Sequence, residues 1–267
     1  MPEPAPAAVL AGRHAIVTGG SRGIGAAIAA ALAARGADVT LMGRDPSTLS
    51  ARRERLLADG ATGRIATEAA DLADAGRLTA GFESAAARLG PAAILVNNAG
   101  IAPSAPFAKQ TLADWNAVLA LDLTAAFLAS QRVLPGMIAG GFGRIVNVAS
   151  TAGLTGYRYV AAYCAAKHGL VGLTRALALE TAAQGVTVNA VCPGFTDTDL
   201  IATAARTISA KTGRSEAAAR AELARANPQG RLVDPAEVAQ MVAFLCQPEA
   251  AAITGQAIAI AGGEVLH

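Results

Sequence analysis

The sequence alternates short, wholly apolar runs with longer segments of helical periodicity, and this alternation limits the possible fold more than any other feature. Runs that are apolar along their full length are typical of strands buried on both faces of a sheet. Because such strands alternate here with helices, the chain predicts βαβ units, a parallel sheet and a single-domain, doubly wound α/β fold. The predicted strands are 14–17, 38–42, 64–70, 93–96, 143–148, 187–191 and 257–260, and the predicted helices are 23–35, 46–59, 112–139, 157–184 and 235–246.

The composition excludes several classes of protein. The chain has 267 residues, of which 53% are apolar and only 16% are charged, so it can fill a large core. Its net charge of +2 is too small to predict a nucleic-acid or anionic-membrane partner. Cys164, Cys192 and Cys246 are odd in number and far apart, so they predict neither a disulfide framework nor a metal site.

The ends of the chain and one insertion complete the domain prediction. Residues 1–10 begin with a Pro-rich stretch and are expected to be flexible, ahead of one domain over 11–267. The segment lacks the basic start and apolar run of a signal peptide, and no stretch of about 18 residues predicts a membrane span, so we expect a cytoplasmic protein. Residues 199–227 form an Ala/Arg-rich insertion, which predicts a substrate lid or, alternatively, a solvated helical excursion.

A glycine-rich loop follows the first predicted strand and opens the first predicted helix. Within Thr18–Gly25, the residues Gly19, Gly23 and Gly25 allow a tight turn and a close approach of the backbone to a pyrophosphate. The helix that follows adds free N–H groups and a positive dipole end. Although the spacing is GxxxGxG and not GxGxxG, this strand–loop–helix position predicts a dinucleotide site.

Three polar residues could perform proton chemistry at a carbonyl or an alcohol. Tyr163 and Lys167 are four residues apart, so on a helix they share one face, and Ser150 precedes the tyrosine by thirteen residues. A phenol with its ordinary pKa of about 10 is a poor base at pH 7, and a fixed positive charge beside it lowers that pKa. Alone, this spacing is more often a surface pair than a catalytic one.

These motifs together resemble a classical short-chain dehydrogenase/reductase along essentially the whole chain, in the 3-hydroxybutyrate and 3-hydroxyacyl thioester dehydrogenase-like branch. The resemblance implies a Rossmann-like fold and a homotetramer. The motifs stand in family order at family spacing, and they are Thr18–Gly25, Asp71-Leu72, Asn97–Gly100, Asn147–Ser150, Tyr163–Lys167, and Pro193-Gly194 with Thr198.

The resemblance also implies a role for each site residue. Tyr163 is expected to be the acid/base, Lys167 to hold the nicotinamide ribose and lower the pKa of the tyrosine, and Ser150 to bind the substrate oxygen. Asp71 is expected at the adenine, and Asn97–Gly100 along the cofactor. The candidate cofactor-binding residues are Gly19, Ser21, Arg22, Gly23, Ile24, Gly25, Arg44, Asp71, Leu72, Asn98, Ala99, Gly100, Tyr163, Lys167, Pro193, Gly194, Thr196 and Thr198.

The end of the second predicted strand decides between the two nicotinamide cofactors. An acidic residue there would accept both ribose hydroxyls and select NAD(H). This chain has Gly43 and then Arg44, with Asp45 only afterwards, and Arg22 lies in the glycine loop. Because two guanidinium groups can hold a 2′-phosphate, we favour NADP(H) over NAD(H). Arg44 as a solvated surface residue is the alternative.

The chain departs from the family pattern at a position that normally carries asparagine. Here the run is Leu121-Asp122-Leu123-Thr124, so Asp122 replaces the residue that helps to hold a water next to the lysine. A carboxylate beside Lys167 would raise the pKa of the lysine and weaken its effect on Tyr163. We count Asp122 as a fourth candidate catalytic residue and expect an altered pH optimum.

A second departure concerns the substrate. Hydroxybutyrate dehydrogenases of this family bind a free carboxylate with a histidine and a lysine, and the corresponding positions here are Ala152 and Val160. A buried carboxylate without polar partners is costly. With Ser150 and Tyr163, these residues therefore predict a pocket for a neutral ketone or alcohol, or for a hydroxyacyl thioester whose charge stays outside.

We therefore predict an NAD(P)-dependent oxidoreductase that interconverts a secondary alcohol and a ketone by hydride transfer. A β-ketoacyl thioester reductase of fatty-acid or polyester synthesis is one alternative. A non-catalytic nucleotide-binding scaffold is another, and its expected signature, damage to Ser150, Tyr163 or Lys167, is absent from the sequence.

Overall fold

The computed structural model describes residues 8–266, so most of the segment predicted to be flexible lies outside the described residues. Leu10 falls inside and is fully buried in the core against the first strands. The packed domain therefore begins before residue 11.

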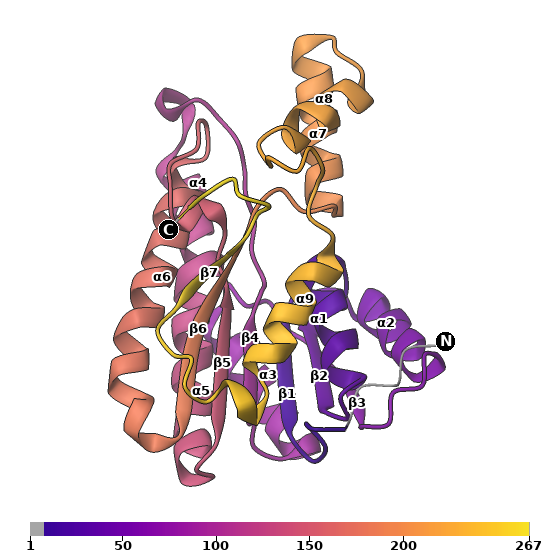
Figure 1. Ribbon diagram of the computed structural model, residues 1–267, viewed down its shortest axis with the longest axis vertical. Coiled ribbons are helices and arrows are strands. Elements are labelled where there is room, and N and C mark those ends of the chain that lie inside the picture. The colour runs from indigo at the N-terminus through magenta and orange to yellow at the C-terminus, as the bar shows by residue number, and fades with distance from the viewer. Residues whose placement is uncertain (1–7, 267) are drawn as a thin grey trace.

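The described residues form one seven-stranded parallel sheet with the strand order β3-β2-β1-β4-β5-β6-β7 (Figure 1). This confirms the predicted doubly wound α/β class. The strands are β1 (His14–Thr18), β2 (Asp38–Gly43), β3 (Ile65–Ala69), β4 (Ile94–Asn97), β5 (Gly143–Val148), β6 (Val186–Pro193) and β7 (Ala257–Ile260).

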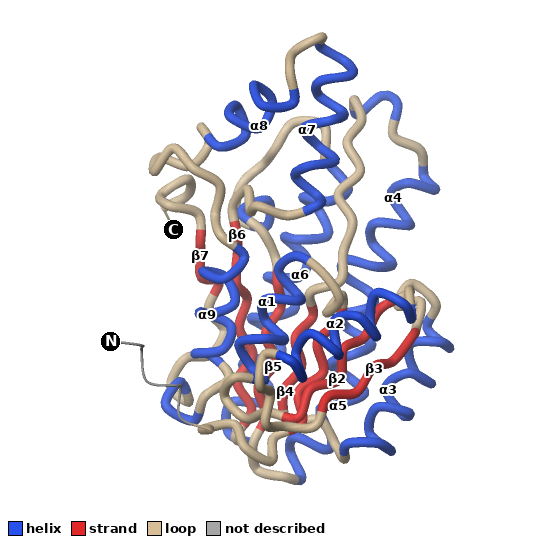
Figure 2. The backbone as a smooth tube through the Cα atoms, turned by 90° about the vertical axis from the view of Figure 1, so that its right-hand side faces the viewer, coloured by secondary structure: helices blue, strands red, loops and turns tan. Residues whose placement is uncertain are grey.

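Helices cover both faces of the sheet. Helices α1, α2 and α9 pack on one face through one apolar cluster, and α3 and α5 pack on the other through a second cluster. In Figure 2 the strands lie between these two layers. The helices are α1 (Gly23–Ala33), α2 (Pro46–Ala58), α3 (Ala75–Leu89), α4 (Leu112–Leu119), α5 (Ala125–Ala139), α6 (Ala161–Thr181), α7 (Asp199–Thr212), α8 (Glu216–Ala224) and α9 (Pro235–Leu245).

The strand order reverses between β1 and β4, because the chain builds outward from β1 in one direction and from β4 in the other. Ligands of open parallel sheets bind outside the carboxyl ends of the strands at such a switch point. The β1–α1 loop and the loop after β4 therefore lie side by side where a dinucleotide is expected.

Helix α3 is absent from the predicted elements, although the sequence carries its signals. Asp74 caps the helix by accepting hydrogen bonds from the N–H groups of Gly76 and Arg77, at 2.9 and 3.0 Å. Leu78, Phe82 and Ala85 then repeat at helical spacing and are buried. Both signals are local, so this helix was predictable from the sequence.

The predicted helix 157–184 begins later than expected. Helix α6 starts at Ala161 and ends at Thr181, followed by a 3₁₀ turn at Ala182–Gln184. Tyr159 lies at φ +71°, in the left-handed region that a helix does not use, and its carbonyl accepts a hydrogen bond from the N–H of Ala105 at 2.9 Å. The loop before α6 is therefore held apart from the helix.

The predicted helix 112–139 is divided. A π-helical turn at Ala120–Thr124 (η2) joins α4 to α5 and contains Asp122. This stretch, Leu112–Ala139, is long and apolar enough to cross a membrane by length and composition alone, with a mean hydropathy of 1.5 over its best window. A core helix passes the same test, and 39% of that window is buried inside this domain.

The insertion 199–227 folds as α7 and α8, which project beyond the carboxyl ends of the strands (Figure 1). Arg220 of α8 forms an ion pair with Asp197, which lies in the loop between β6 and α7. The insertion is thus tied to the edge of the sheet where the candidate site lies.

Candidate active site

Asn98, in the loop after β4, holds the glycine loop in place. The Asn98 side-chain amide donates to the carbonyls of Thr18 and Gly19, at 2.9 and 3.3 Å. In return, the Thr18 hydroxyl accepts hydrogen bonds from the N–H groups of Asn98 and Ala99, at 2.9 and 3.1 Å. These contacts fix the two loops of the switch point against each other.

Two glycines allow the close approach of Asn98 to the loop, because any side chain there would clash with it. A Cβ on Gly25 would lie 2.5 Å from the Asn98 side-chain nitrogen, and one on Gly19, at φ +64°, would lie 2.8 Å from it. Helix α1 starts at Gly23, and Arg22 at its N-cap position makes no side-chain cap. The first-turn N–H groups therefore stay available to an anion, and the loop fits the pyrophosphate of a dinucleotide.

At the end of β2, Arg44 is exposed, and the neighbouring Asp45 caps the helix that follows. Arg44 is exposed and lines an open hollow of about 540 Å³, together with Asp71 and Arg77. Asp45 caps α2 instead, accepting hydrogen bonds from the backbone and the hydroxyl of Ser47 at 2.9 and 2.7 Å. These bonds lower the pKa of Asp45 below its ordinary value.

The loop after β6 reaches the glycine loop from the other side. The methyl group of Thr198 lies 3.2 Å from where a Cβ of Gly23 would be. The Thr196 hydroxyl donates to the carbonyl of Gly194 at 2.9 Å, and the Thr198 hydroxyl donates to the carbonyl of Thr196 at 3.2 Å. The predicted residues Gly23, Gly194, Thr196 and Thr198 are thus brought together.

The remaining cofactor candidates lie around these loops in different environments. Leu72 is buried in the core, and Ile24 packs against the core on the other face of the sheet. Asp71 closes a local turn by accepting from the N–H of Ala73 at 3.1 Å. Ser21 carries a contact absent from the predictions, because its carbonyl accepts a hydrogen bond from Arg52 at 3.3 Å.

Ser150, Tyr163 and Lys167 converge at the carboxyl end of β5. Ser150 follows β5 and starts a 3₁₀ turn, with its hydroxyl accepting from the N–H of Ala152 at 3.1 Å. Tyr163 stands in the first turn of α6, and the Lys167 ammonium lies 5.4 Å from the centre of the tyrosine ring. The ammonium also donates to the carbonyl of Val148 at 3.0 Å, which ties α6 to β5.

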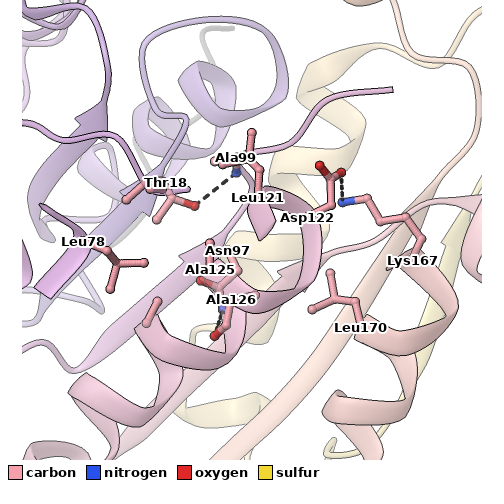
Figure 3. A pocket seen from close by; sticks show the side chains of 12 residues that line it. Thr18, Leu78, Asn97, Ala99, Leu121, Asp122, Ala125, Ala126, Lys167 and Leu170 are labelled. Carbon is pink, nitrogen blue, oxygen red and sulfur yellow. Dashed lines mark hydrogen bonds and ion pairs between the residues drawn. The ribbon is translucent and has the colours of Figure 1, made fainter. Parts of the chain in front are cut away.

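Asp122 forms a buried ion pair with Lys167, and Figure 3 shows the two charged groups pointing toward each other. Its Oδ2 lies 3.4 Å from the ammonium nitrogen, and Oδ1 accepts from the N–H of Ile101 at 2.9 Å. Gly100 permits this approach, because a Cβ there would lie 2.6 Å from Oδ2. The π-helical turn thus carries a charge into the site, as such turns often do at functional positions.

A small internal cavity of about 10 Å³ lies between the ion pair and the sheet. Its polar lining consists of Thr18, Asn97, Asp122 and Lys167. This size and polarity suit about one water molecule. Asn97 contributes to the floor, where its amide donates to Asn147 at 2.9 Å.

The charges of the site act on one another. Burial raises the pKa of Tyr163; Lys167 and the Ser150 hydroxyl oppose this effect, and Asp122 reinforces it. Burial lowers the pKa of Lys167, but the attraction of Asp122 and Tyr163 outweighs burial, so the lysine pKa is raised overall. Burial likewise raises the pKa of Asp122, against the effect of Lys167.

The two positions predicted to matter for the substrate carry no charge. Ala152 is buried in the 3₁₀ turn after Ser150, and Val160 is half-buried directly before α6. Among residues 8–266, no group of three metal-ligating side chains is arranged around an ion site. The chemistry that these residues themselves offer is proton transfer and hydrogen bonding at an oxygen beside a dinucleotide.

The comparison with known families decides the identity of this site. The family model described as short chain dehydrogenase matches residues 13–209. The chain belongs to this family. This short-chain dehydrogenase is an oxidoreductase that interconverts alcohols and ketones with a nicotinamide dinucleotide. The predicted resemblance is confirmed.

The relatives of this short-chain dehydrogenase match over nearly their full length. It is 42% identical over 254 residues to the acetoacetyl-CoA reductase of Shinella zoogloeoides, covering 94% of this chain and 98% of the relative. It is 38% identical over 258 residues to the D-beta-hydroxybutyrate dehydrogenase of Cupriavidus necator, covering 96% and 99%. A solved structure of a point variant of actinorhodin polyketide ketoreductase with NADPH superimposes with a TM-score of 0.89 at 38% identity, covering 94% and 97%.

Three site-lining residues were not predicted. Arg52 and Arg77 reach the cofactor side from α2 and α3, and Glu264 reaches the carboxyl end of the sheet from the segment after β7. An Asp–x–x–Arg run at Asp74–Arg77 could have flagged Arg77 near the start of a helix. No local pattern marks Arg52 or Glu264, because only the tertiary fold brings them to the site.

Replacing Asp122 by asparagine should change the pH dependence of the short-chain dehydrogenase. The carboxylate pushes the pKa of Tyr163 up, so its removal should lower that pKa. Because alcohol oxidation needs the ionised phenol, the rising limb of kcat/KM against pH should move to lower pH in Asp122→Asn. Asp114→Asn, which alters an exposed capping residue on α4, is the control and should not move it. An identical profile in Asp122→Asn and the wild type would contradict this role.

Proposed function

We propose that this short-chain dehydrogenase acts on a neutral 3-oxoacyl or 3-hydroxyacyl thioester with NADP(H). The observation that carries the substrate assignment is the absence of a charged side chain at Ala152 and Val160, which lie two residues after Ser150 and three residues before Tyr163. A thioester places its ketone at such an uncharged site while the charged part of the molecule stays in water. The similarity to an acetoacetyl-CoA reductase supports the same substrate class.

In the proposed mechanism, Tyr163 and Ser150 act on the substrate oxygen, and Lys167 and Asp122 act behind the tyrosine. A bound nicotinamide would supply the hydride that the carbonyl carbon needs. Tyr163 donates its phenolic proton to the carbonyl oxygen, and the Ser150 hydroxyl donates a hydrogen bond to the same atom. Lys167 favours the phenolate that remains, and in alcohol oxidation Tyr163 accepts the proton back. Asp122 holds the lysine from behind.

The glycine loop and its neighbours are the proposed cofactor site. Gly19, Ser21, Arg22, Gly23, Ile24 and Gly25 would hold the pyrophosphate at the start of α1, and Asn98, Ala99 and Gly100 would line its path. Asp71 and Leu72 would meet the adenine. Lys167 would hold the ribose, and Pro193, Gly194, Thr196 and Thr198 would meet the nicotinamide.

The NADP(H) preference is proposed from the residues at the end of β2. Arg44 and Arg77 line the same hollow, beside the carboxylates of Glu68 and Asp71, so two guanidinium groups are available there to a 2′-phosphate. Asp45, which could otherwise accept ribose hydroxyls, is committed to capping α2. A related structure that contains NADPH agrees with this assignment.

Arg44→Asp should reverse the cofactor preference. The substitution removes a cation and adds an acceptor, so kcat/KM with NADPH should fall by about tenfold or more relative to NADH. Arg55→Asp makes the same charge change on α2 at a residue already paired with Asp59, and it should leave the ratio unchanged. Initial rates with both cofactors measure the effect. An unchanged ratio in Arg44→Asp would refute the phosphate assignment.

Tyr163→Phe should abolish turnover but preserve cofactor binding. Loss of the acid/base should lower kcat by at least about 10²-fold, whereas the ring and the lysine remain in place. The measurement is a panel of acetoacetyl-CoA, neutral ketones and secondary alcohols with both cofactors, together with NADPH fluorescence on binding. Thr155→Val, which removes an exposed hydroxyl from the loop before α6, is the control. Equal rates in Tyr163→Phe and the wild type would eliminate the mechanism, and a wild type inactive on acetoacetyl-CoA would eliminate the thioester.

Residues 199–227 are proposed as the substrate lid of the single domain, whose core includes Leu10. The ion pair between Arg220 and Asp197 holds α8 toward the loop that carries Thr198.

We also propose that the protein is a cytoplasmic homotetramer. Phe127 and Ile138 on α5 and Leu179 on α6 leave large apolar side chains exposed on neighbouring helices. Light scattering after gel filtration should give four times the chain mass, and charged substitution of Leu179 should lower it. A single species at the mass of one chain would contradict the assembly, and cell fractionation tests the location.

A further inference from the structure

Glu264 brings a carboxylate to the substrate side of the site from the last segment of the chain. This segment leaves β7 at the carboxyl end of the sheet, the end beyond which α7 and α8 project (Figure 1). The Glu264 N–H donates to the carbonyl of Ala261 at 3.1 Å, so a tight turn through two glycines positions the residue.

A chain of hydrogen bonds joins Glu264 to the turn that follows Ser150. The Tyr157 hydroxyl donates to Oε1 of Glu264, and its oxygen lies 2.8 Å from the hydroxyl of Thr151. Because a phenol has a single proton to donate, the Thr151 hydroxyl must donate to the phenol. The carboxylate is therefore two hydrogen bonds away from Thr151, a buried residue between Ser150 and Ala152.

The second oxygen of Glu264 is buried without a hydrogen-bond partner among residues 8–266. It lies against the backbone of Gly194, because a Cβ on that glycine would be 2.6 Å from Oε2. A buried carboxylate oxygen that no donor satisfies is costly and calls for an explanation. Gly194 belongs to the loop proposed to meet the nicotinamide, so the negative charge stands beside the reaction centre.

No cation within the described part of the chain neutralises this charge. None of the ion pairs formed by residues 8–266 includes Glu264. Arg158, in the loop before α6, is exposed and its charge is screened by solvent. Ala152 and Val160 add no positive charge, and the Lys167 ammonium is already paired with Asp122, so Glu264 adds a negative charge without an ion-pair partner among the described residues.

We infer that Glu264 is a specificity-determining residue that rejects substrates carrying a negative charge close to the reacting carbonyl. A like charge in a poorly solvated pocket weakens binding of the wrong substrate without any contact to the right one. The inference rests on the proposed function and deepens it. Free 3-oxo acids are excluded by repulsion as well as by the missing cationic partners, whereas esters and thioesters with the same ketone are accepted.

Acetoacetate and methyl acetoacetate test this inference, because they share a ketone and differ in charge. The ratio of kcat/KM for the ester to that for the acid, measured with NADPH on the full-length protein, should fall about tenfold in Glu264→Gln. Glutamine keeps the size and the acceptor for Tyr157 but removes the charge. Glu264→Met, also neutral, should shift the ratio in the same direction.

Two control variants separate charge from structure. Tyr157→Phe breaks the hydrogen bond but keeps the carboxylate, so it should not shift the ratio toward the acid. Glu249→Gln removes an exposed carboxylate that precedes β7, at the opposite end of that strand, and should leave the ratio unchanged. A ratio that is the same in wild type, Glu264→Gln and Glu264→Met would overturn the inference.

A binding measurement keeps this test independent of turnover. With NADP⁺ bound the two ketones cannot be reduced, so calorimetry gives the dissociation constant of each. Glu264→Gln should tighten acetoacetate selectively, and equal changes for both compounds would overturn the inference. A wild type that binds the ester but reduces neither it nor acetoacetyl-CoA would instead contradict the proposed function.

Discussion

The buried ammonium of Lys167 is the constraint on which the rest of the site depends. An unpaired buried ammonium would lower the free energy of unfolding by several kcal/mol, on the order of the whole stability of a domain. The structure must therefore supply partners for it at fixed places. The carbonyl of Val148 supplies one at the end of β5, and Asp122 supplies the other from the π-helical turn. Three elements from separate parts of the chain are thereby held at one point, and Tyr163 is placed by the same helix as the lysine.

The ion pair also explains the irregular helix between α4 and α5. A continuous α-helix would change the direction of the side chain at 122, whereas the π-helical turn lets Oδ1 meet the N–H of Ile101 while Oδ2 faces Lys167. The loop after β4 is thus tied to the site through Gly100 and Ile101. Removing one partner of such a pair leaves the other unpaired, so geometry and stability are coupled here.

The sequence predicted the features that depend on local pattern. Largely apolar runs located the seven strands of the described residues, and the glycine spacing placed the predicted dinucleotide loop at β1 and α1. Two predicted helix boundaries were wrong, because longer-range contacts determine them. Helix α6 begins later than predicted, since Tyr159 lies in the left-handed region. The helix 112–139 is interrupted at 120–124 by the π-helical turn that contains Asp122. Helix α3 is different, because the cap at Asp74 and the spacing of Leu78 and Phe82 are local signals that were sufficient to predict it.

The candidate site shows the same division between local and distant signals. Ser150, Tyr163 and Lys167 follow from a motif, whereas Glu264 is separated from Thr151 by more than one hundred residues and meets it only through Tyr157. Hydrogen bonds inside the chain also show which candidate ligand groups are already occupied, and residue spacing does not. Asp45 lies near the position where an acid would bind the ribose hydroxyls. Its carboxylate instead accepts hydrogen bonds from Ser47 at the start of α2. One of its two oxygens is thus engaged by the helix cap, and the adjacent Arg44 contributes a positive charge to that rim.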